Sequence, residues 1–221
     1  MLSKCCLYQR REEVMKKVAI LTFSNTTNYG AVLQAYALKN KLINLGYDAE
    51  VLNYNCQAVK EREKIHVFDK NIRVTIKNIL LIYPKFIRKI TFKKFVRREN
   101  LYTKKTYNDK NISSTNNEYD IYVVGSDQVW NLQLSGYDYH YFLNFVSENK
   151  TKVSYAASLG SDEIDFQEYS MVVKFLKKFN YLLLAKIVLL LLSSFLEEFV
   201  SVLHKHLVQF RCLRTIHLSI P

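Results

Sequence analysis

The sequence has few residues that break regular secondary structure: its 221 residues include 5 Gly and 2 Pro. Glycine and proline interrupt helices and strands, so their scarcity excludes a collagen-like or loop-rich chain. The hydrophobic fraction of 49% is sufficient for a packed core. At this length the chain can form one large domain or two small ones.

Cysteine is also sparse, with four positions at Cys5, Cys6, Cys56 and Cys212. Their spacing matches neither a metal site nor a disulfide framework, so we expect a reducing, cytoplasmic location, no metal and no bound cofactor. The N-terminus lacks the apolar core of a signal peptide. The apolar run 187–192 reaches at most about half of the length that a helix needs to span a bilayer, so we expect no membrane span.

Negative charge is scarce in one segment, and this segment supplies nearly all of the formal net charge of +12 that the chain carries. Between Lys60 and Lys110 there are 16 Lys and Arg against 5 Asp and Glu. Apolar residues alternate with these cations over 79–98, which predicts basic amphipathic helices broken near Pro84. Such helices could bind a membrane surface or another polyanion. We favour an ordinary helical insertion whose Phe side chains pack on a core, and we expect no nucleic-acid partner.

The first part of the chain predicts a strand–helix–strand unit. Lys17 to Phe23 has the composition of a buried strand, 31–45 has the apolar spacing of a helix, and Asp48 to Tyr54 has the composition of the next strand. We expect a right-handed crossover between parallel strands. The polar loop 24–30 opens onto a helix N-terminus, which favours anions, but it matches neither GxGxxG nor a P-loop.

A polar loop follows the predicted strand Tyr119–Val124. It has the sequence Gly-Ser-Asp-Gln-Val-Trp-Asn over 125–131 and contains the only Trp of the chain. Ligands of open α/β sheets bind beyond the carboxyl ends of the strands, and polar groups beside an aromatic ring suit a sugar. The alternative is a capped turn in which Trp130 fills the core.

A further strand is predicted over 152–158, followed by a helix over 164–179. Ser161 or Asp162 could cap this helix, and the neighbouring N–H groups make a second candidate anion site. The alternative is a simple helix cap without a ligand.

Taken together, four stretches resemble the N-terminal half of the polysaccharide pyruvyl transferases. They are NYGAVLQAYAL over 28–38, YD with GSDQVWN over 119–131, YFLNFV over 141–146 and SYAAS over 154–158. The resemblance covers about Met15 to Tyr181. It implies an α/β fold with a Rossmann-like parallel sheet, flanking helices and a basic helical insertion at 58–105. This would be one half of a two-domain architecture similar to glycosyltransferase B.

The resemblance also implies a function, in which the pyruvyl group of phosphoenolpyruvate is transferred to a sugar of a cell-surface polysaccharide as a ketal. The partners would be phosphoenolpyruvate and a saccharide or lipid-linked glycan. Apart from the resemblance, the basic segment could make a peripheral membrane contact. In this family the Arg- and His-bearing parts of the phosphoenolpyruvate site lie mostly in the C-terminal half. Two alternatives are a glycosyltransferase that uses a nucleotide sugar and a non-catalytic basic docking module.

Asp127 is the candidate catalytic residue, as a general base or an anchor for a sugar hydroxyl. The candidate substrate-binding residues all follow predicted strands: Asn28, Tyr29, Gly30, Gly125, Ser126, Gln128, Trp130, Asn131, Ser158 and Gly160.

The two ends of the chain depart from the family pattern. We interpret 1–14 as a non-native leader, because purine-rich codons before Met15 could form a ribosome-binding site. The leucine-rich stretch 182–221 suggests translation in a shifted frame, and the alternative is a genuine amphipathic helix. On this hypothesis the chain is a truncated, inactive fragment with a domain over 15–181.

Overall fold

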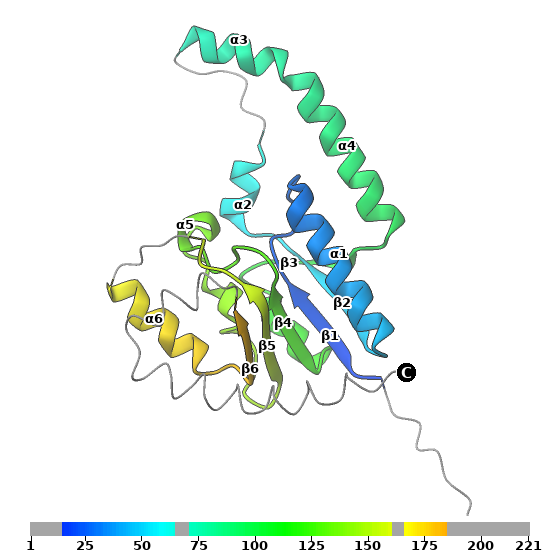
Figure 1. The fold of residues 1–221 in the computed structure, drawn as a ribbon, viewed down its shortest axis with the longest axis vertical. Helices are drawn as coiled ribbons and strands as arrows, with labels where there is room; N and C mark the ends of the chain where they lie inside the picture. The colour runs from blue at the N-terminus through cyan, green and yellow to red at the C-terminus, as the bar shows by residue number, and fades with distance from the viewer. Residues whose placement is uncertain (1–14, 65–70, 161–165, 185–221) are drawn as a thin grey trace, which may run out of the picture.

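A computed structural model describes residues 15–64, 71–160 and 166–184 of the chain. They form a six-stranded sheet in which every strand is parallel to its neighbours, in the order β3-β2-β1-β4-β5-β6. The strands are β1 (Lys17–Leu21), β2 (Asp48–Tyr54), β3 (Tyr102–Tyr107), β4 (Ile121–Gly125), β5 (Thr151–Ala157) and β6 (Tyr181–Leu184). The predicted Rossmann-like α/β fold is therefore confirmed (Figure 1).

Helices connect the strands. They are α1 (Tyr29–Asn44), α2 (Gln57–Arg62), α3 (Ile72–Leu80), α4 (Ile82–Arg98), α5 (Leu132–Ser135) and α6 (Phe166–Leu176), with short 3-10 turns η1 (Ile112–Asn117) and η2 (Tyr139–Phe142). Of these helices, α1 and α6 lie along the sheet (Figure 1). A crossover between parallel strands is present, because α1 joins the parallel neighbours β1 and β2.

The direction in which strands are added reverses at β1. Val18 pairs in register with Ala49 of β2 on one side and with Ile121 of β4 on the other. The loops that leave β1 and β4 therefore diverge and open a crevice at the carboxyl edge of the sheet. In open α/β sheets this reversal point is where ligands bind.

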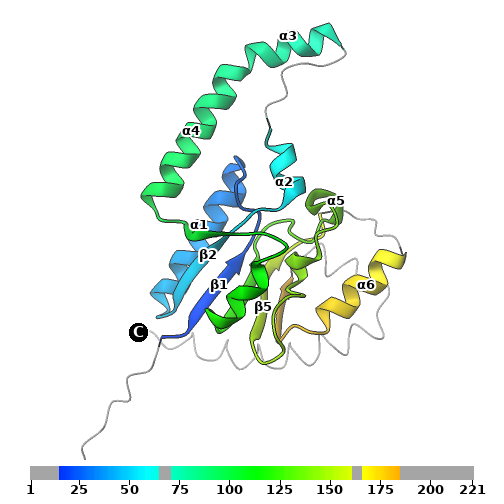
Figure 2. The same ribbon diagram turned by 180° about the vertical axis from the view of Figure 1, so that it is seen from behind.

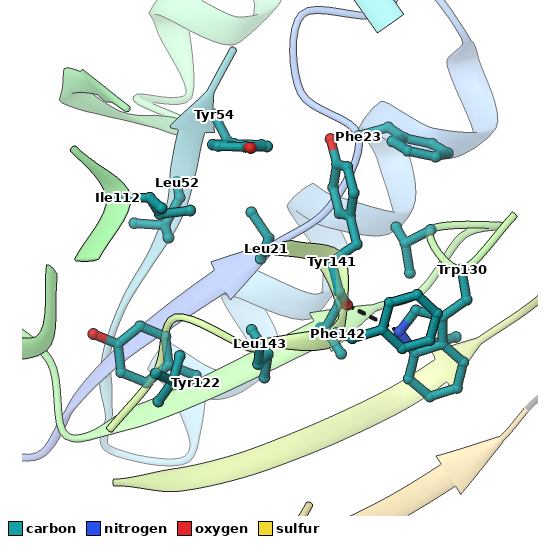
Figure 3. Close-up of a cluster of buried hydrophobic side chains, with 14 of the residues drawn as sticks. Leu21, Phe23, Leu52, Tyr54, Ile112, Tyr122, Trp130, Tyr141, Phe142 and Leu143 are labelled. Carbon is teal, nitrogen blue, oxygen red and sulfur yellow. Dashed lines mark hydrogen bonds between the residues drawn. The ribbon is translucent and has the colours of Figure 1, made fainter. Parts of the chain in front are cut away.

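Two apolar layers cover the faces of the sheet. One packs α1 and part of α4 against alternate residues such as Ile20 and Val51. The other contains α6 and the loops after β4, and it holds the largest buried side chains, including Trp130 and Tyr141 (Figure 3). Strand alternation sends Leu21 to this second layer and Ile20 to the first, so both faces of the sheet are apolar.

Helices α3 and α4 form an arm, residues 72–98, that extends from the body (Figures 1 and 2). The C-terminal half of α4 packs on α1, where Phe95 meets Tyr36 at 5.4 Å between ring centroids and Phe92 is buried. The rest of the arm leaves eight large apolar side chains exposed: Ile72, Ile76, Ile79, Leu80, Leu81, Tyr83, Phe86 and Ile87. The predicted packing of the Phe side chains therefore holds for only half of the arm.

The predicted break near Pro84 is confirmed, and it lies at Leu81, just before the proline. Leu81 is both the C-cap of α3 and the N-cap of α4, so Pro84 falls in the first turn of α4. Proline is tolerated there because the first N–H groups of a helix have no partner within the helix. The arm is also shorter than the predicted insertion 58–105, since α2 precedes it and β3 joins the sheet edge.

Several predictions fall outside the described residues: the leader 1–14, the caps Ser161 and Asp162, and most of the leucine-rich stretch, 185–221. Residues 182–184 were expected in that stretch, and they form the end of β6 beside β5. Within the described ranges, none of the helices combines the length and the apolar character that a bilayer span requires.

Candidate functional site

The loop after β4 is fastened to the segment after β5. The Ser158 N–H donates to the Asp127 carbonyl at 3.1 Å, and the Trp130 N–H donates to the Ser158 carbonyl at 3.1 Å. The Ser158 hydroxyl in turn accepts from the Gly160 N–H at 3.1 Å. The structure thus brings together the predicted residues of both strand ends, although they are about thirty residues apart in the chain.

Two glycines make this close approach possible. Gly125 has φ +115°, and a Cβ there would collide with the carbonyl oxygen of Tyr155. Gly160 has φ +71°, and a Cβ there would lie 2.5 Å from Gln128 Oε1 and 2.7 Å from Asn131 Nδ2. The amide side chains of the β4 loop therefore lie directly over the Gly160 backbone, where only glycine fits without displacement.

Asp127 lies half-buried in this loop, at the wall of a cavity of about 330 Å³. One carboxylate oxygen accepts from the Gln128 N–H at 2.7 Å. Burial raises the pKa of Asp127, and this hydrogen bond only partly offsets the effect. A carboxyl group with a raised pKa beside a cavity is a candidate acid or base. The cavity is lined by Phe23, Thr26, Asn28, Val59, Arg62, Glu63, Asp127, Gln128 and Leu134.

Trp130 and Asn131 have structural roles in this conformation. The Trp130 ring is fully buried, stacks on Phe142 with centroids 5.5 Å apart, and donates its Nε1–H to the Tyr141 carbonyl at 2.9 Å (Figure 3). Asn131 caps α5, because its side-chain oxygen accepts from the Leu134 N–H at 3.0 Å. The Trp130 ring thus contacts the core rather than a surface that a sugar can reach. Ser126 is half-buried at the start of the same loop.

The loop after β1 divides its residues between two sides. Asn28 lines the Asp127 cavity and also caps α1, accepting from the Gly30 N–H at 2.9 Å. Tyr29 is 58% exposed and packs its ring on Phe92 of the arm, with centroids 4.6 Å apart. Asn28, Asp127 and Gln128 therefore share one cavity, whereas Tyr29 faces the arm and Gly30 serves the helix N-terminus.

Next to this cavity lies a larger basic groove of about 1010 Å³, between α4, the carboxyl ends of β1 and β2, and the length of β3. Six cationic side chains line it: Lys60, Lys64, Lys89, Lys93, Arg97 and Lys104. Glu63 is the one carboxylate among the lining residues, and it accepts from the Thr26 and Thr27 hydroxyls at 2.9 Å and 2.8 Å. Thr26 and Glu63 line both the groove and the Asp127 cavity, so the two spaces adjoin.

Amide and hydroxyl groups form part of the groove lining. Asn25 donates to the side-chain oxygen of Asn53 at 3.0 Å, and Asn53 donates to the Thr106 hydroxyl at 3.1 Å. Arg88 of α4 also reaches the β1 loop, with its guanidinium 2.8 Å from the Thr27 hydroxyl. Sequence reasoning missed the groove, although the excess of positive charge after Lys60 was the signal that could have found it.

A polar network lies at the end of β2. The Tyr54 hydroxyl donates to Asp138 at 2.6 Å, and the Asp138 carboxylate is 2.6 Å from His140 Nδ1. Burial alone would raise the pKa of Asp138, but hydrogen bonds from His140 and Tyr54 lower it below its usual range. Burial and the bond to Asp138 raise the pKa of Tyr54. These shifts describe a carboxylate held in place by hydrogen bonds rather than a poised base.

Among the described residues, no group of three or more His, Cys, Asp and Glu side chains is placed to hold a metal ion. Cys56 is buried, and burial raises the pKa of its thiol, so the thiolate that acts as a nucleophile is disfavoured. The groups available around the cavity and the groove are therefore two carboxyl groups, Asp127 and Glu63, together with several amides and an excess of cations.

Comparison with known proteins agrees with the resemblance seen in the sequence. The family model of polysaccharide pyruvyl transferase matches residues 28–184. Searches of curated proteins and of solved structures found no match. The matched range runs from the Asn28 cap through the Asp127 loop to the end of β6, so it contains all the predicted site residues, whereas Phe23 and Thr26 of the cavity lining precede it. The chain belongs to the polysaccharide pyruvyl transferase family.

Proposed function

We propose that this protein transfers the pyruvyl group of phosphoenolpyruvate to a saccharide, and that Asp127 is the base that activates a sugar hydroxyl. The observation that carries the proposal is the position of Asp127, in a cavity that adjoins the basic groove. The reaction needs a proton acceptor near the sugar and positive charge near phosphate and carboxylate. Both kinds of group lie along one edge of the sheet.

The transfer forms a ketal and releases inorganic phosphate. Two hydroxyl oxygens of one sugar form bonds to the central carbon of phosphoenolpyruvate, its methylene carbon gains a proton, and the carbon–oxygen bond to phosphate breaks. One hydroxyl proton balances the new C–H bond, and the other leaves with phosphate. Asp127 takes a proton from the attacking hydroxyl, and its raised pKa brings it nearer to neutral pH, where a general base is most effective.

The remaining residues of the site position the acceptor. Asn28 and Gln128 line the same cavity as Asp127 and offer amide groups to sugar hydroxyls. Ser158 fastens the loop through the Asp127 carbonyl and the Trp130 N–H, and the Gly160 backbone lies against the Gln128 side chain. Gly125 permits the turn that directs Ser126 and Asp127 toward the crevice.

The basic groove attracts the anionic part of the substrates toward this cavity. A groove lined by charge of one sign concentrates ligands of the opposite sign. Phosphoenolpyruvate carries both phosphate and carboxylate, and Arg97 and the groove lysines offer donors to such groups. This role adds to the cationic residues that the family resemblance places in the C-terminal half. We place the reaction in the cytoplasm, with a saccharide or lipid-linked glycan as acceptor.

The direct test uses the full chain with phosphoenolpyruvate and a panel of acceptor glycans. Release of inorganic phosphate that depends on the acceptor, with a ketal detected by mass spectrometry of the glycan, supports the proposal. Transfer from a nucleotide sugar to the same acceptors, with phosphoenolpyruvate left intact, contradicts it. Asp127→Asn is the matched control, because it keeps the shape of the side chain and removes its basicity.

A further inference from the structure

The outer part of the arm has an unusual surface for an exposed helix pair. Four apolar side chains of α3 are about half exposed or more: Ile72 at 69%, Ile76 at 52%, Ile79 at 50% and Leu80 at 72%. The spacing of 72, 76 and 79 puts them on one face of α3. Isolated exposed apolar residues are normal, but a continuous stripe marks an interaction surface.

The stripe continues past the bend at Leu81 onto the first turns of α4. Tyr83 is 72% exposed, Phe86 53% and Ile87 43%. Their spacing of three and four residues puts them on one face of α4. Farther along α4 the aromatic residues turn inward, since Phe92 is buried and Phe95 packs on Tyr36. The apolar surface is therefore confined to the outer end of the arm.

The charge of the arm is entirely positive. Residues 72–98 contain nine Lys and Arg and no Asp or Glu. The nine are Arg73, Lys77, Lys85, Arg88, Lys89, Lys93, Lys94, Arg97 and Arg98. The centres of protein–protein interfaces are depleted of Lys, whereas helices that lie on anionic bilayers combine an apolar stripe with Lys and Arg. Charge complementarity thus favours an anionic lipid surface over another protein.

The direction of the arm agrees with such a partner. The arm extends beyond the carboxyl edge of the sheet, the edge that carries the basic groove and the Asp127 cavity (Figures 1 and 2). A surface that the end of the arm touches would therefore face the site. The long Lys and Arg side chains can bring their charged ends to lipid headgroups while the apolar side chains enter the interface.

We propose that the outer end of the arm docks on an anionic membrane surface, with the stripe from Ile72 to Ile87 inserted at the level of the headgroups. The proposal does not depend on the transfer reaction, because binding is measured without substrate.

The first experiment is sedimentation of the full chain with two kinds of vesicle. One contains phosphatidylcholine alone, and the other contains about 30% phosphatidylglycerol, an anionic lipid. We expect binding to the anionic vesicles that is at least about tenfold tighter than to neutral ones and that weakens as salt rises. The triple variant Ile76→Ser, Leu80→Ser, Tyr83→Ser should lose at least about tenfold in binding, because it removes inserted apolar area.

A matched control removes exposed apolar residues from another helix. Leu33, Ile43 and Leu45 lie on or directly after α1 and are 54%, 44% and 54% exposed. Their triple change to Ser should leave vesicle binding unchanged. Equal binding to neutral and anionic vesicles, or equal binding of the arm variant and the wild type, overturns the proposal. So does a loss of self-association in the arm variant with vesicle binding intact, since the stripe would then join two copies.

A second measurement detects insertion directly. The single native Trp130 is fully buried, so its emission is insensitive to a distant surface. Tyr83→Trp adds an exposed fluorophore within the stripe. We expect its emission to shift to shorter wavelength when anionic vesicles are added and to stay unchanged with neutral ones. An unshifted spectrum at saturating anionic lipid contradicts insertion of the arm, whether or not the chain sediments.

Discussion

The two sides of the carboxyl edge differ in charge and in the size of the space that they enclose. On the β4–β5 side, the loop of Asp127 is held by backbone hydrogen bonds to Ser158, and its space is a small cavity of about 330 Å³. On the β1–β3 side, a groove of about 1010 Å³ is lined by six cations. The first side fixes the Asp127 carboxyl group in position, and the second creates a positive electrostatic potential. Proton transfer requires the former, and attraction of an anion requires the latter.

The largest expected effect comes from the substitution of Asp127. Asp127→Asn should lower kcat by about 10²–10⁴-fold, the usual contribution of a general acid or base. The amide oxygen can still accept from the Gln128 N–H, so the fold should persist, which circular dichroism would check. If the variant retains wild-type ketal formation, Asp127 is not the base, and the division between the two sides fails.

A smaller effect is expected on the cationic side. Replacing Lys60, Lys93 and Arg97 together by Gln should raise KM for phosphoenolpyruvate by about tenfold and change kcat little, because attraction acts before the chemical step. Lys41, Lys110 and Lys174 are exposed and absent from the groove lining, so their triple change to Gln is the matched control. Equal KM values in the two triple variants would contradict a role of the groove in binding.

The backbone fit between the two loops can be tested at Gly160. Gly160→Ala places a Cβ at φ +71° against Gln128 Oε1 and Asn131 Nδ2, both side-chain atoms. We expect the free energy of unfolding to fall by about 1 kcal/mol from the left-handed backbone, together with a few-fold loss of kcat/KM as Gln128 moves. Chemical denaturation and kinetics measure the two parts. The same change at Gly46, which has open space around it, controls for the strain alone.

The smallest effect is the dependence of stability on pH. The folded-state pKa of Asp127 is raised by burial, so the folded protein binds this proton more tightly than the unfolded chain does. The resulting stability is present at low pH and is lost as pH rises from the ordinary Asp pKa through the raised one. Melting curves should therefore show that the stability of Asp127→Asn increases relative to that of the wild type as pH rises through that window. A difference that is independent of pH would mean that the carboxylate is not desolvated.

The sequence predicted most of the sheet because its central strands are apolar and β-branched. β1, β2, β4 and β5 are each close to the predicted ranges. β3 was absorbed into the predicted insertion, because its Lys104 and Lys105 belong to an edge strand that needs few apolar residues. Sequence periodicity detects burial, so a polar edge strand escapes it.

The candidate site was predictable only where one loop supplies several residues. Asp127 and Gln128 follow one strand directly, and the position of their loop at the sheet edge is fixed by the topology. The groove collects Lys60 from α2, Arg97 from α4 and Lys104 from β3, so it exists only after folding. Trp130 shows the opposite difficulty, since a composition typical of a sugar site also suits a core residue.

The arm has a consequence for the time course of synthesis. β1 lies between β2 and β4, and Lys17 at its start reaches Asp120 across 103 residues of chain. At roughly 5–20 residues per second, β4 leaves the ribosome on the order of 5–20 s after β1. During that interval α1 and β2 are the partners that can shield β1, and the arm lengthens the wait. A nascent chain of this topology therefore presents one uncovered strand edge for seconds, which is when a chaperone that recognises extended apolar segments would act on it.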